Sequence, residues 1–184
     1  YFGKKRGVID ILFVQGYNKD KESGRCRNGG FTMKVVNIGS MNIDYVYQMA
    51  HFIRPGETAP CKARTAGCGG KGLNQSVALA QAGLAVYHAG LIGPEAGFLV
   101  QKMQEKGVDT SLIRAGEGAN GHAIIQVDEA GQNCIILYPG TNHQFTHDYI
   151  DGVLSHFAPG DIAVLQNEIN EIPYIIERCH EAGI

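Results

Sequence analysis

From residue 33 onward, short apolar runs alternate with amphipathic helical patterns, and this alternation restricts the possible folds more than any other feature of the sequence. The run KVVNIG is typical of a short buried strand, and the later segment GKGLNQSVALAQAG places Leu73, Val77 and Ala80 on one face of a helix. Strands and helices that alternate in this way form a mostly parallel sheet with helices on its faces. The sequence therefore predicts an α/β fold.

The same alternation continues along the rest of the chain. AVYHAGLIG predicts a second strand, and the helix that follows is expected to begin at Pro94 and to end just before Gly107. Two further helical stripes flank a strand with the sequence DIAVLQ. They consist of Ile150, Val153, Leu154 and Phe157 before that strand, and of Ile172, Ile175, Ile176 and Cys179 after it.

Two segments, residues 45–66 and 121–138, interrupt the alternation. The first contains no helical stripe, and the second contains two strand patterns joined by DEAG, which is typical of a hairpin turn. Both follow strand ends on the side of an α/β sheet where ligands bind. We therefore expect them to form together a small β-sheet lid over a ligand site.

Residues 1–32 differ in composition from the rest of the chain. They carry seven Lys or Arg against three Asp or Glu, whereas residues 33–184 carry nine against fifteen. A secretory signal peptide is the functional alternative, but an Asp interrupts the short apolar run and no A-x-A cleavage pattern follows. We interpret residues 1–32 as a leader or added segment outside the fold, which is expected to begin at Met33.

Charge and cysteine content exclude several classes of protein. The formal net charge is −2, so no basic surface is expected for a nucleic-acid backbone. No apolar run reaches the roughly 18 residues that a membrane-spanning helix needs. The five cysteines show no metal-binding spacing, and we interpret them as reduced thiols of a cytoplasmic protein. Cys61 and Cys68 would pair only in an oxidising compartment.

Asn42 and Asp44 directly follow the first predicted strand and are two positions apart. In extended backbone their side chains point the same way. A carboxylate that accepts hydroxyl protons beside an amide that donates and accepts suits a polyhydroxyl ligand. The alternative is a solvated loop with an Asx turn.

A glycine-dense stretch, residues 67–75, leads into the next predicted helix. Free backbone N–H groups at a helix start favour an oxygen-rich or anionic ligand, and Gly70, Lys71 and Asn74 lie about one turn apart on one side. The alternative is a tight structural turn. Gly67-x-Gly69-x-x-Gly72 also fits the dinucleotide fingerprint, but CKARTA before it is no buried strand, and the P-loop pattern fails as well.

Three motifs occur in an order that is more specific than any of them alone. GSMNID follows the first strand, GGKGLNQ opens the first helix, and LQNE follows a later strand. In this the chain resembles the ribokinase/PfkB family of carbohydrate kinases over residues 33–184, about the first half of a typical member. Lys71 within GGKG favours the ribokinase branch.

The resemblance implies a ribokinase-like fold and a sugar site. Asn42 and Asp44 would bind sugar hydroxyls, Gly70, Lys71 and Asn74 would contribute from the helix start, and Glu168 would complete this half of the site. The parent enzyme would transfer the ATP γ-phosphate to the primary hydroxyl of ribose or a similar small sugar, with Mg²⁺ on the nucleotide and a monovalent cation such as K⁺ as activator. The lid would pair two subunits into a homodimer.

No residue of this chain is expected to be the catalytic base. The family's base is an Asp in a Gly-Ala-Gly-Asp motif, which this sequence lacks, and Asp161 in Pro159-Gly160-Asp161 leads into a strand and not into a helix. We therefore expect this chain alone to lack the nucleotide site and to be inactive. The alternatives are a non-catalytic sugar-binding or lid-mediated interaction module and a nucleotide-dependent dehydrogenase, which rests only on the G-x-G-x-x-G match.

The histidines do not predict a metal site. His143 and His147 are four residues apart, but Thr146 is expected to cap the helix that follows, so that His143 lies before this helix and His147 in its first turn. No Glu lies between them as in the zinc-binding motif H-E-x-x-H.

Overall fold

The computed structural model describes residues 27–28 and 31–184. Within the N-terminal segment, β1 (Arg27–Asn28) pairs with β2 (Phe31–Thr32) in antiparallel orientation. Residues 1–26 and 29–30 lie outside the described residues, so the interpretation of 1–32 as a leader stays a prediction.

A three-stranded parallel sheet forms the centre of the fold. Its strands are β3 (Val35–Ile38), β6 (Val86–Ala89) and β11 (Ile162–Leu165), in the order β11-β3-β6. A second parallel pair, β7 (Leu91–Ile92) with β8 (Arg114–Ala115), continues beyond β6. The predicted α/β fold with a parallel sheet is confirmed.

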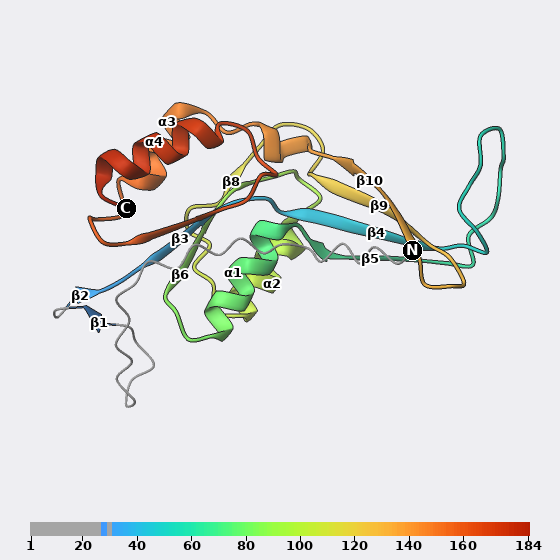
Figure 1. Ribbon diagram of the computed structural model, residues 1–184, viewed down its shortest axis with the longest axis horizontal. Helices are drawn as coiled ribbons and strands as arrows, with labels where there is room; N and C mark the ends of the chain where they lie inside the picture. Colours follow the sequence, from blue (N-terminus) through green and yellow to red (C-terminus); the bar gives the residue numbers. More distant parts are fainter. Residues whose placement is uncertain (1–26, 29–30) are drawn as a thin grey trace, which may run out of the picture.

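Helices cover both faces of this sheet (Figure 1). On one side lie α1 (Lys71–Gln81) and α2 (Gly97–Glu105), which pack over a cluster that includes Val35, Leu73, Leu99 and Met103. On the other side lie α3 (His147–Leu154) and α4 (Ile172–Ala182), over a cluster that includes Val36, Ile38, Ile150, Val153 and Ile175. Adjacent residues of β3 thus pack into the two clusters on opposite faces of the sheet, as expected for a central strand whose side chains alternate.

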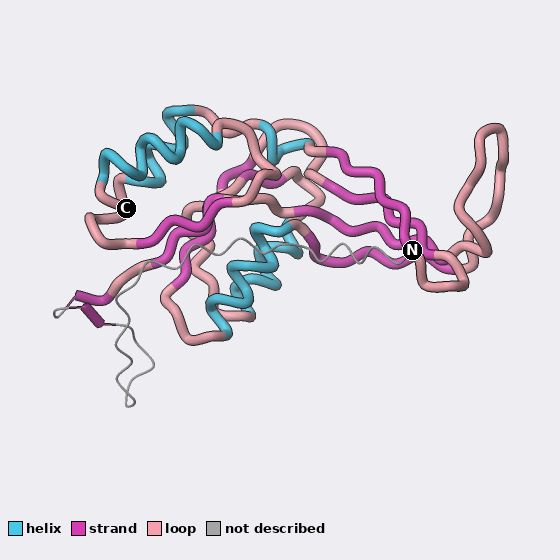
Figure 2. Tube along the Cα trace, in the orientation of Figure 1, coloured by secondary structure: helices cyan, strands magenta, loops and turns pink. Residues whose placement is uncertain are grey.

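A second, four-stranded sheet extends from the end of this layer (Figure 2). It consists of β4 (Asn42–Gln48), β5 (Ala63–Gly69), β9 (His122–Val127) and β10 (Asn133–Tyr138), in the order β10-β9-β4-β5. Both segments predicted as β therefore join in one sheet, which we call the lid. β4 and β9 run parallel, whereas β4–β5 and β9–β10 are antiparallel.

Several predicted boundaries are wrong. Pro94 lies in a turn and α2 begins only at Gly97, although Gly107 ends that helix with a φ of 82°, as predicted. Phe157 lies beyond the end of α3, and Ile176 of α4 is 55% exposed, so neither belongs to the buried stripe of its helix. The glycine-dense stretch is a loop only at Gly70, because β5 continues to Gly69.

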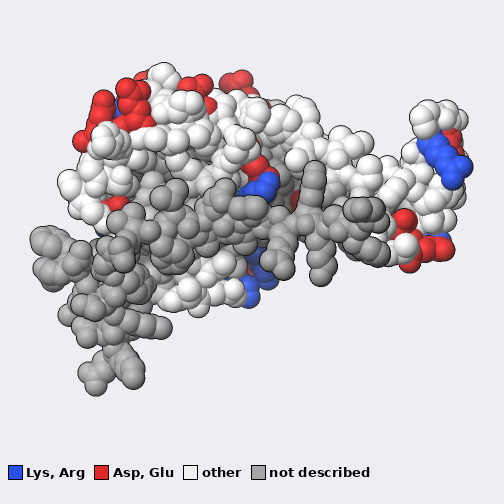
Figure 3. Space-filling view, in the orientation of Figure 1, with Lys and Arg blue, Asp and Glu red and all other residues white. Residues whose placement is uncertain are grey.

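No helix among the described residues is long and apolar enough to cross a membrane. Cys61 and Cys68 are both free thiols. On the face shown in Figure 3, outside the grey atoms, Lys and Arg side chains form small separate groups among acidic ones rather than one continuous basic surface.

Candidate functional site

The predicted site residues come from three places that the fold brings to one edge of the central sheet. Asn42 and Asp44 begin lid strand β4 just after β3, Gly70 and Lys71 begin α1, and Glu168 follows β11. β3 and β11 are adjacent and parallel, so their carboxyl ends meet at this edge. Sequence segments more than a hundred residues apart thereby share one site.

Glu168 is anchored by three donors. The Ser40 hydroxyl donates to Oε2 at 2.6 Å, the backbone N–H of Lys71 donates to the same oxygen at 3.0 Å, and the Lys71 ammonium group pairs with Oε1. Partial burial favours the neutral acid, but the hydrogen bonds from Lys71 and Ser40 outweigh it, so the pKa of Glu168 is lowered. Glu168 is therefore an ionised, fixed carboxylate.

The backbone amides at the start of α1 are already occupied, so the prediction that they are free for a ligand is wrong. Besides Lys71 N, Gly72 N donates to the Ser40 hydroxyl at 3.2 Å and Leu73 N to the Ser40 carbonyl at 2.9 Å. The anion that the helix start attracts is the protein's own Glu168. Gly72 lies so close that a Cβ would come within 2.5 Å of the Ser40 nitrogen.

Asp44, in contrast, accepts no hydrogen bond from the residues that the structure describes. Its carboxylate lies against Gly69, where an added Cβ would be 2.1 Å from Oδ1. Burial, and then the nearby charge of Glu168, raise the pKa of Asp44. Asp44 is thus a half-buried acceptor whose charge a hydroxyl donor would stabilise.

Asn42 is 7% exposed and belongs to the same strand face as Asp44, as the two-residue spacing predicts. Its Oδ1 accepts a hydrogen bond of 2.7 Å from Nδ2 of Asn142. Asn142 was missed by the sequence reasoning, since it lies a hundred positions away and belongs to no motif. Ser40 was missed as well, although it stands inside GSMNID.

Gly70 and Asn74 complete the predicted set. Gly70 has a φ of 92°, and a Cβ there would lie 2.9 Å from both the Asn42 nitrogen and the Ser40 carbonyl oxygen, so the fold itself requires glycine. The Asn74 side chain is exposed one turn along the helix. The structure brings these residues together, and their role as sugar ligands stays a prediction.

Beneath the site, three amide side chains form a chain of hydrogen bonds that the sequence did not reveal. Nε2 of Gln166 donates to Oδ1 of Asn37 and to Oε1 of Gln75, each at 2.7 Å, and Nδ2 of Asn37 donates to the Gly72 carbonyl at 2.8 Å. These bonds connect β3, α1 and the loop after β11. They fix the distance between the start of α1 and Glu168.

Other candidate chemistry is structural. Asp161 accepts hydrogen bonds from the backbone of Lys34 and Ala158, at 2.8 and 2.9 Å, and so stabilises the turn that leads into β11, the strand predicted to follow it. Thr146 caps α3, as predicted, and His147 pairs with Glu171 at 3.1 Å. No cluster of three His, Cys, Asp or Glu suited to a metal occurs among the described residues.

The G-x-G-x-x-G match also lacks its required context. Gly67 and Gly69 lie in antiparallel strand β5 of the lid, not in a turn that follows a parallel strand. Dinucleotide binding at this stretch has no structural support.

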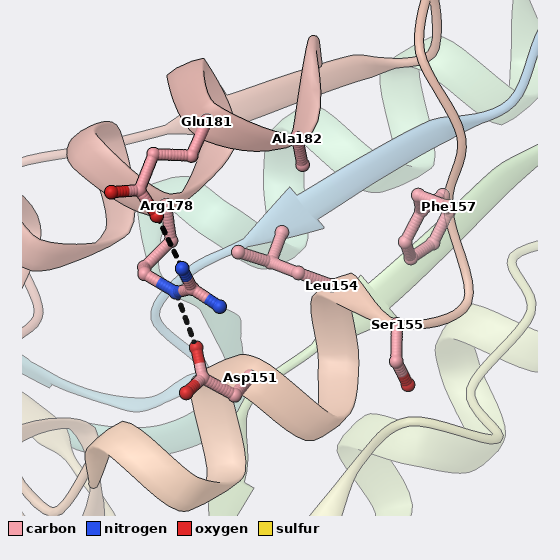
Figure 4. A pocket seen from close by; sticks show the side chains of 7 residues that line it. All are labelled: Asp151, Leu154, Ser155, Phe157, Arg178, Glu181 and Ala182. Carbon is pink, nitrogen blue, oxygen red and sulfur yellow. Dashed lines mark hydrogen bonds and ion pairs between the residues drawn. The ribbon is translucent and has the colours of Figure 1, made fainter.

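A cavity of about 340 Å³ lies elsewhere, between α3 and α4 (Figure 4). Arg178 points into it and is paired with Asp151 at 2.8 Å and with Glu181. Its charge is balanced within the cavity wall, and none of the predicted site residues lines it.

Comparison with known proteins shows the family of the chain. The model of the pfkB family carbohydrate kinases matches residues 32–171. The chain is 34% identical over 149 residues to a ribokinase from Staphylococcus aureus, covering 79% of this chain and 49% of that protein. It spans about half the length of the curated relatives it matches.

Solved structures show the same relationship. A ribokinase from Cryptococcus neoformans in complex with ADP superimposes with a TM-score of 0.68 at 30% identity, covering 83% of this chain and 46% of that one. A ribokinase from Arabidopsis thaliana, complexed with ribose and ATP, superimposes with a TM-score of 0.70 at 26% identity, covering 84% and 52%. The chain belongs to the ribokinase/PfkB family of carbohydrate kinases.

Proposed function

We propose that this chain is the sugar-binding half of an ATP-dependent kinase that phosphorylates ribose on its primary hydroxyl. The observation that carries the proposal is that two neighbouring carboxylates differ in their hydrogen bonds and in their pKa shifts. Glu168 is held by Ser40 and Lys71, whereas Asp44 beside it accepts nothing from the described residues and has a raised pKa. A ligand that donates hydroxyl hydrogen bonds to Asp44 would stabilise its ionised carboxylate.

The lid supplies the second half of such a site. Ala123 of β9 is the cross-strand partner of Asp44, and Ile125 and Leu137 lie on the same face of the sheet by strand alternation. These apolar side chains suit the C–H face of a sugar whose hydroxyl groups bind Asn42 and Asp44. The relatives named above, one of them solved with ribose and ATP, favour ribose among small sugars.

The described residues do not fit the nucleotide. A γ-phosphate needs free backbone donors or a cationic clamp, but the amides at residues 71–73 are occupied and Lys71 is paired with Glu168. ATP with Mg²⁺, and a monovalent cation such as K⁺, therefore belong to the proposed parent enzyme.

Calorimetric titration of the chain with ribose, 2-deoxyribose, fructose, adenosine and NAD tests the proposal. Ribose is expected to bind most tightly and NAD not at all. Binding of ribose to the unmodified chain, together with its loss in Asp44→Ala, would support the assignment. Equal affinity of both proteins for ribose contradicts the role of Asp44, and absence of ribose binding by either contradicts the proposed function.

A non-catalytic sugar-binding module is the second candidate, and the occupied helix start favours it for this chain taken alone. The two candidates predict the same binding and differ only in phosphate transfer by the parent. A coupled assay of ADP release with the parent protein separates them.

A further inference from the structure

Asn142 lies where the chain leaves the lid and re-enters the main domain. It belongs to the 3₁₀ helix Gly140–His143 that follows β10, and it is only 2% exposed. Both ends of its amide are used. Oδ1 accepts the backbone N–H of Met41 at 3.0 Å, and Nδ2 donates to Oδ1 of Asn42 at 2.7 Å.

This contact fixes which end of the Asn42 amide is available. The backbone N–H of Met41 can be bonded only by the oxygen of Asn142, so the nitrogen of Asn142 must face Asn42, and the oxygen of Asn42 must face Asn142. Nδ2 of Asn42 donates to none of the described residues and is not among the buried atoms without a partner. It therefore remains accessible, and strand alternation places the Asn42 side chain on the same face of β4 as Asp44.

The surrounding backbone leaves the pair little freedom. Gly121, at the entrance to β9, lies directly against it, and an added Cβ would be 2.0 Å from Nδ2 of Asn142 and 2.6 Å from Oδ1 of Asn42. Asn120 holds the next peptide group, since its Nδ2 donates to the Met41 carbonyl at 2.9 Å. Two buried asparagines from two lid connections thus hold Met41 directly before Asn42.

We propose that Asn142 is a positioning residue that turns Asn42 into a dedicated hydrogen-bond donor toward the sugar. The inference rests on the proposed function, in which Asn42 and Asp44 bind the sugar. Asn42 then donates to one hydroxyl oxygen while Asp44 accepts the proton of a hydroxyl group. A neighbouring pair of hydroxyls satisfies both at once, which makes this corner selective for a vicinal diol.

The first test is Asn142→Asp, with ribose affinity measured by calorimetry. The new carboxylate still accepts the Met41 N–H but has no donor for Asn42, so the Asn42 amide is expected to turn its nitrogen inward and present its oxygen beside Asp44. Ribose affinity is expected to fall roughly tenfold. Asn120→Asp is the matched control, because Asn120 donates to the Met41 carbonyl but forms no hydrogen bond with Asn42. This change is expected to lower the stability of the fold more than the affinity for ribose.

A double-mutant cycle separates positioning from a general structural effect. If Asn142 acts through Asn42, the Asn142→Asp change should cost no ribose affinity in an Asn42→Ala background. An equal loss in both backgrounds would mean that Asn142 supports only the fold, and would overturn the proposal.

Nuclear magnetic resonance of the sugar-free chain gives a readout that does not depend on the proposed function. The side-chain amide protons of Asn142 are expected to exchange slowly with solvent and those of Asn42 rapidly. The reverse order would overturn the inferred orientation. Protected Asn142 protons in a chain that fails to bind ribose would confirm the orientation and refute the ribose assignment alone.

Discussion

The carboxylate of Glu168 lies 3.0 Å from the backbone nitrogen of Lys71, across a sequence separation of 97 residues. This contact joins the loop after β11 to the first turn of α1. The ammonium group of the Lys71 side chain also forms an ion pair with Glu168. The helix start is thereby neutralised by the protein itself. What is left for a ligand is the neighbouring carboxylate of Asp44, together with Nδ2 of Asn42.

Asp44→Asn is expected to stabilise the sugar-free protein while weakening sugar binding. Because the pKa of Asp44 is raised in the folded state, its favourable effect on folding is present at low pH and is lost as pH rises through that pKa. Removing the charge should therefore raise the urea midpoint at pH 7 and reduce the pH dependence of stability above pH 4. Ribose affinity should fall by roughly 1.5–3 kcal/mol. A lowered midpoint with unchanged affinity would contradict both expectations.

Gly69→Ala is expected to impair the site, whereas Gly67→Ala in the same strand is not. A Cβ at Gly69 would lie between 2.1 and 2.3 Å from the Asp44 carboxylate, so that side chain must move, but nothing lies within 4 Å of a Cβ at Gly67. Calorimetry should show weaker ribose binding only for Gly69→Ala. Similar affinities of the two variants would show that Asp44 does not bind the sugar from its present position.

The buried imidazole of His88 is expected to make the protein acid-sensitive. Burial lowers the pKa of His88 to about 4, opposed by a weaker backbone interaction with Gly39, while Ser76 bonds Nδ1 at 2.8 Å. Neutral His88 stabilises the fold above pH 6.5, and this contribution, about 3 kcal/mol, is lost as pH falls toward 4. Urea titrations at pH 7 and 4.5 should show a smaller difference for His88→Asn than for the unmodified chain. The same difference in both would rule out His88 as the source.

The lid is expected to pair two subunits. Edge strand β10 exposes Ile136 and Leu137 at 59% and 60%, and an uncovered apolar edge favours association with a partner lid. Light scattering should show a dimer that dissociates in Ile136→Lys, a change on the lid face opposite Asp44. A strictly monomeric unmodified protein at all concentrations would refute this prediction.

The chain alone is expected to transfer no phosphate from ATP at saturating ribose and magnesium. A base must reach the sugar hydroxyl, and the two carboxylates placed here are committed, Glu168 to Lys71 and Ser40 and Asp44 to the sugar. A coupled assay of ADP release on the purified chain is the measurement. Ribose-dependent turnover above background would show that the catalytic apparatus has been misassigned.

The sequence predicted the architecture well because its main signals are local. Strand runs and helical stripes depend on periodicity alone, and the central sheet, the helices on its faces and the four-stranded lid follow from them. The errors at Pro94 and Phe157 are errors of helix ends, where few residues decide the boundary.

The site was predicted only as far as its motifs extend. Asn42, Asp44 and Glu168 stand in recognisable segments, whereas Asn142 belongs to no motif and contacts a residue a hundred positions away. Gln166 stands within LQNE, but its contact with Asn37 spans 129 positions and cannot be read from that motif. Amide side chains are common on any surface, so no local pattern marks which of them form such contacts. The free helix amides were predicted incorrectly for the same reason, since the hydroxyl and carboxylate that occupy them come from Ser40 and Glu168.

The parallel pairing of β4 with β9 has a consequence for the order of folding. Hairpin β9–β10 can form early from neighbouring residues, but β4 can meet β9 only after the intervening chain, which contains α1 and α2, has been folded back. Closing such a long segment is entropically slow. The central strands β3 and β11 are separated by a still longer segment, so their pairing and that of β4 with β9 should be the last to acquire protection in a pulsed hydrogen-exchange experiment. The candidate site, which both pairings build, should therefore mature only in that final step.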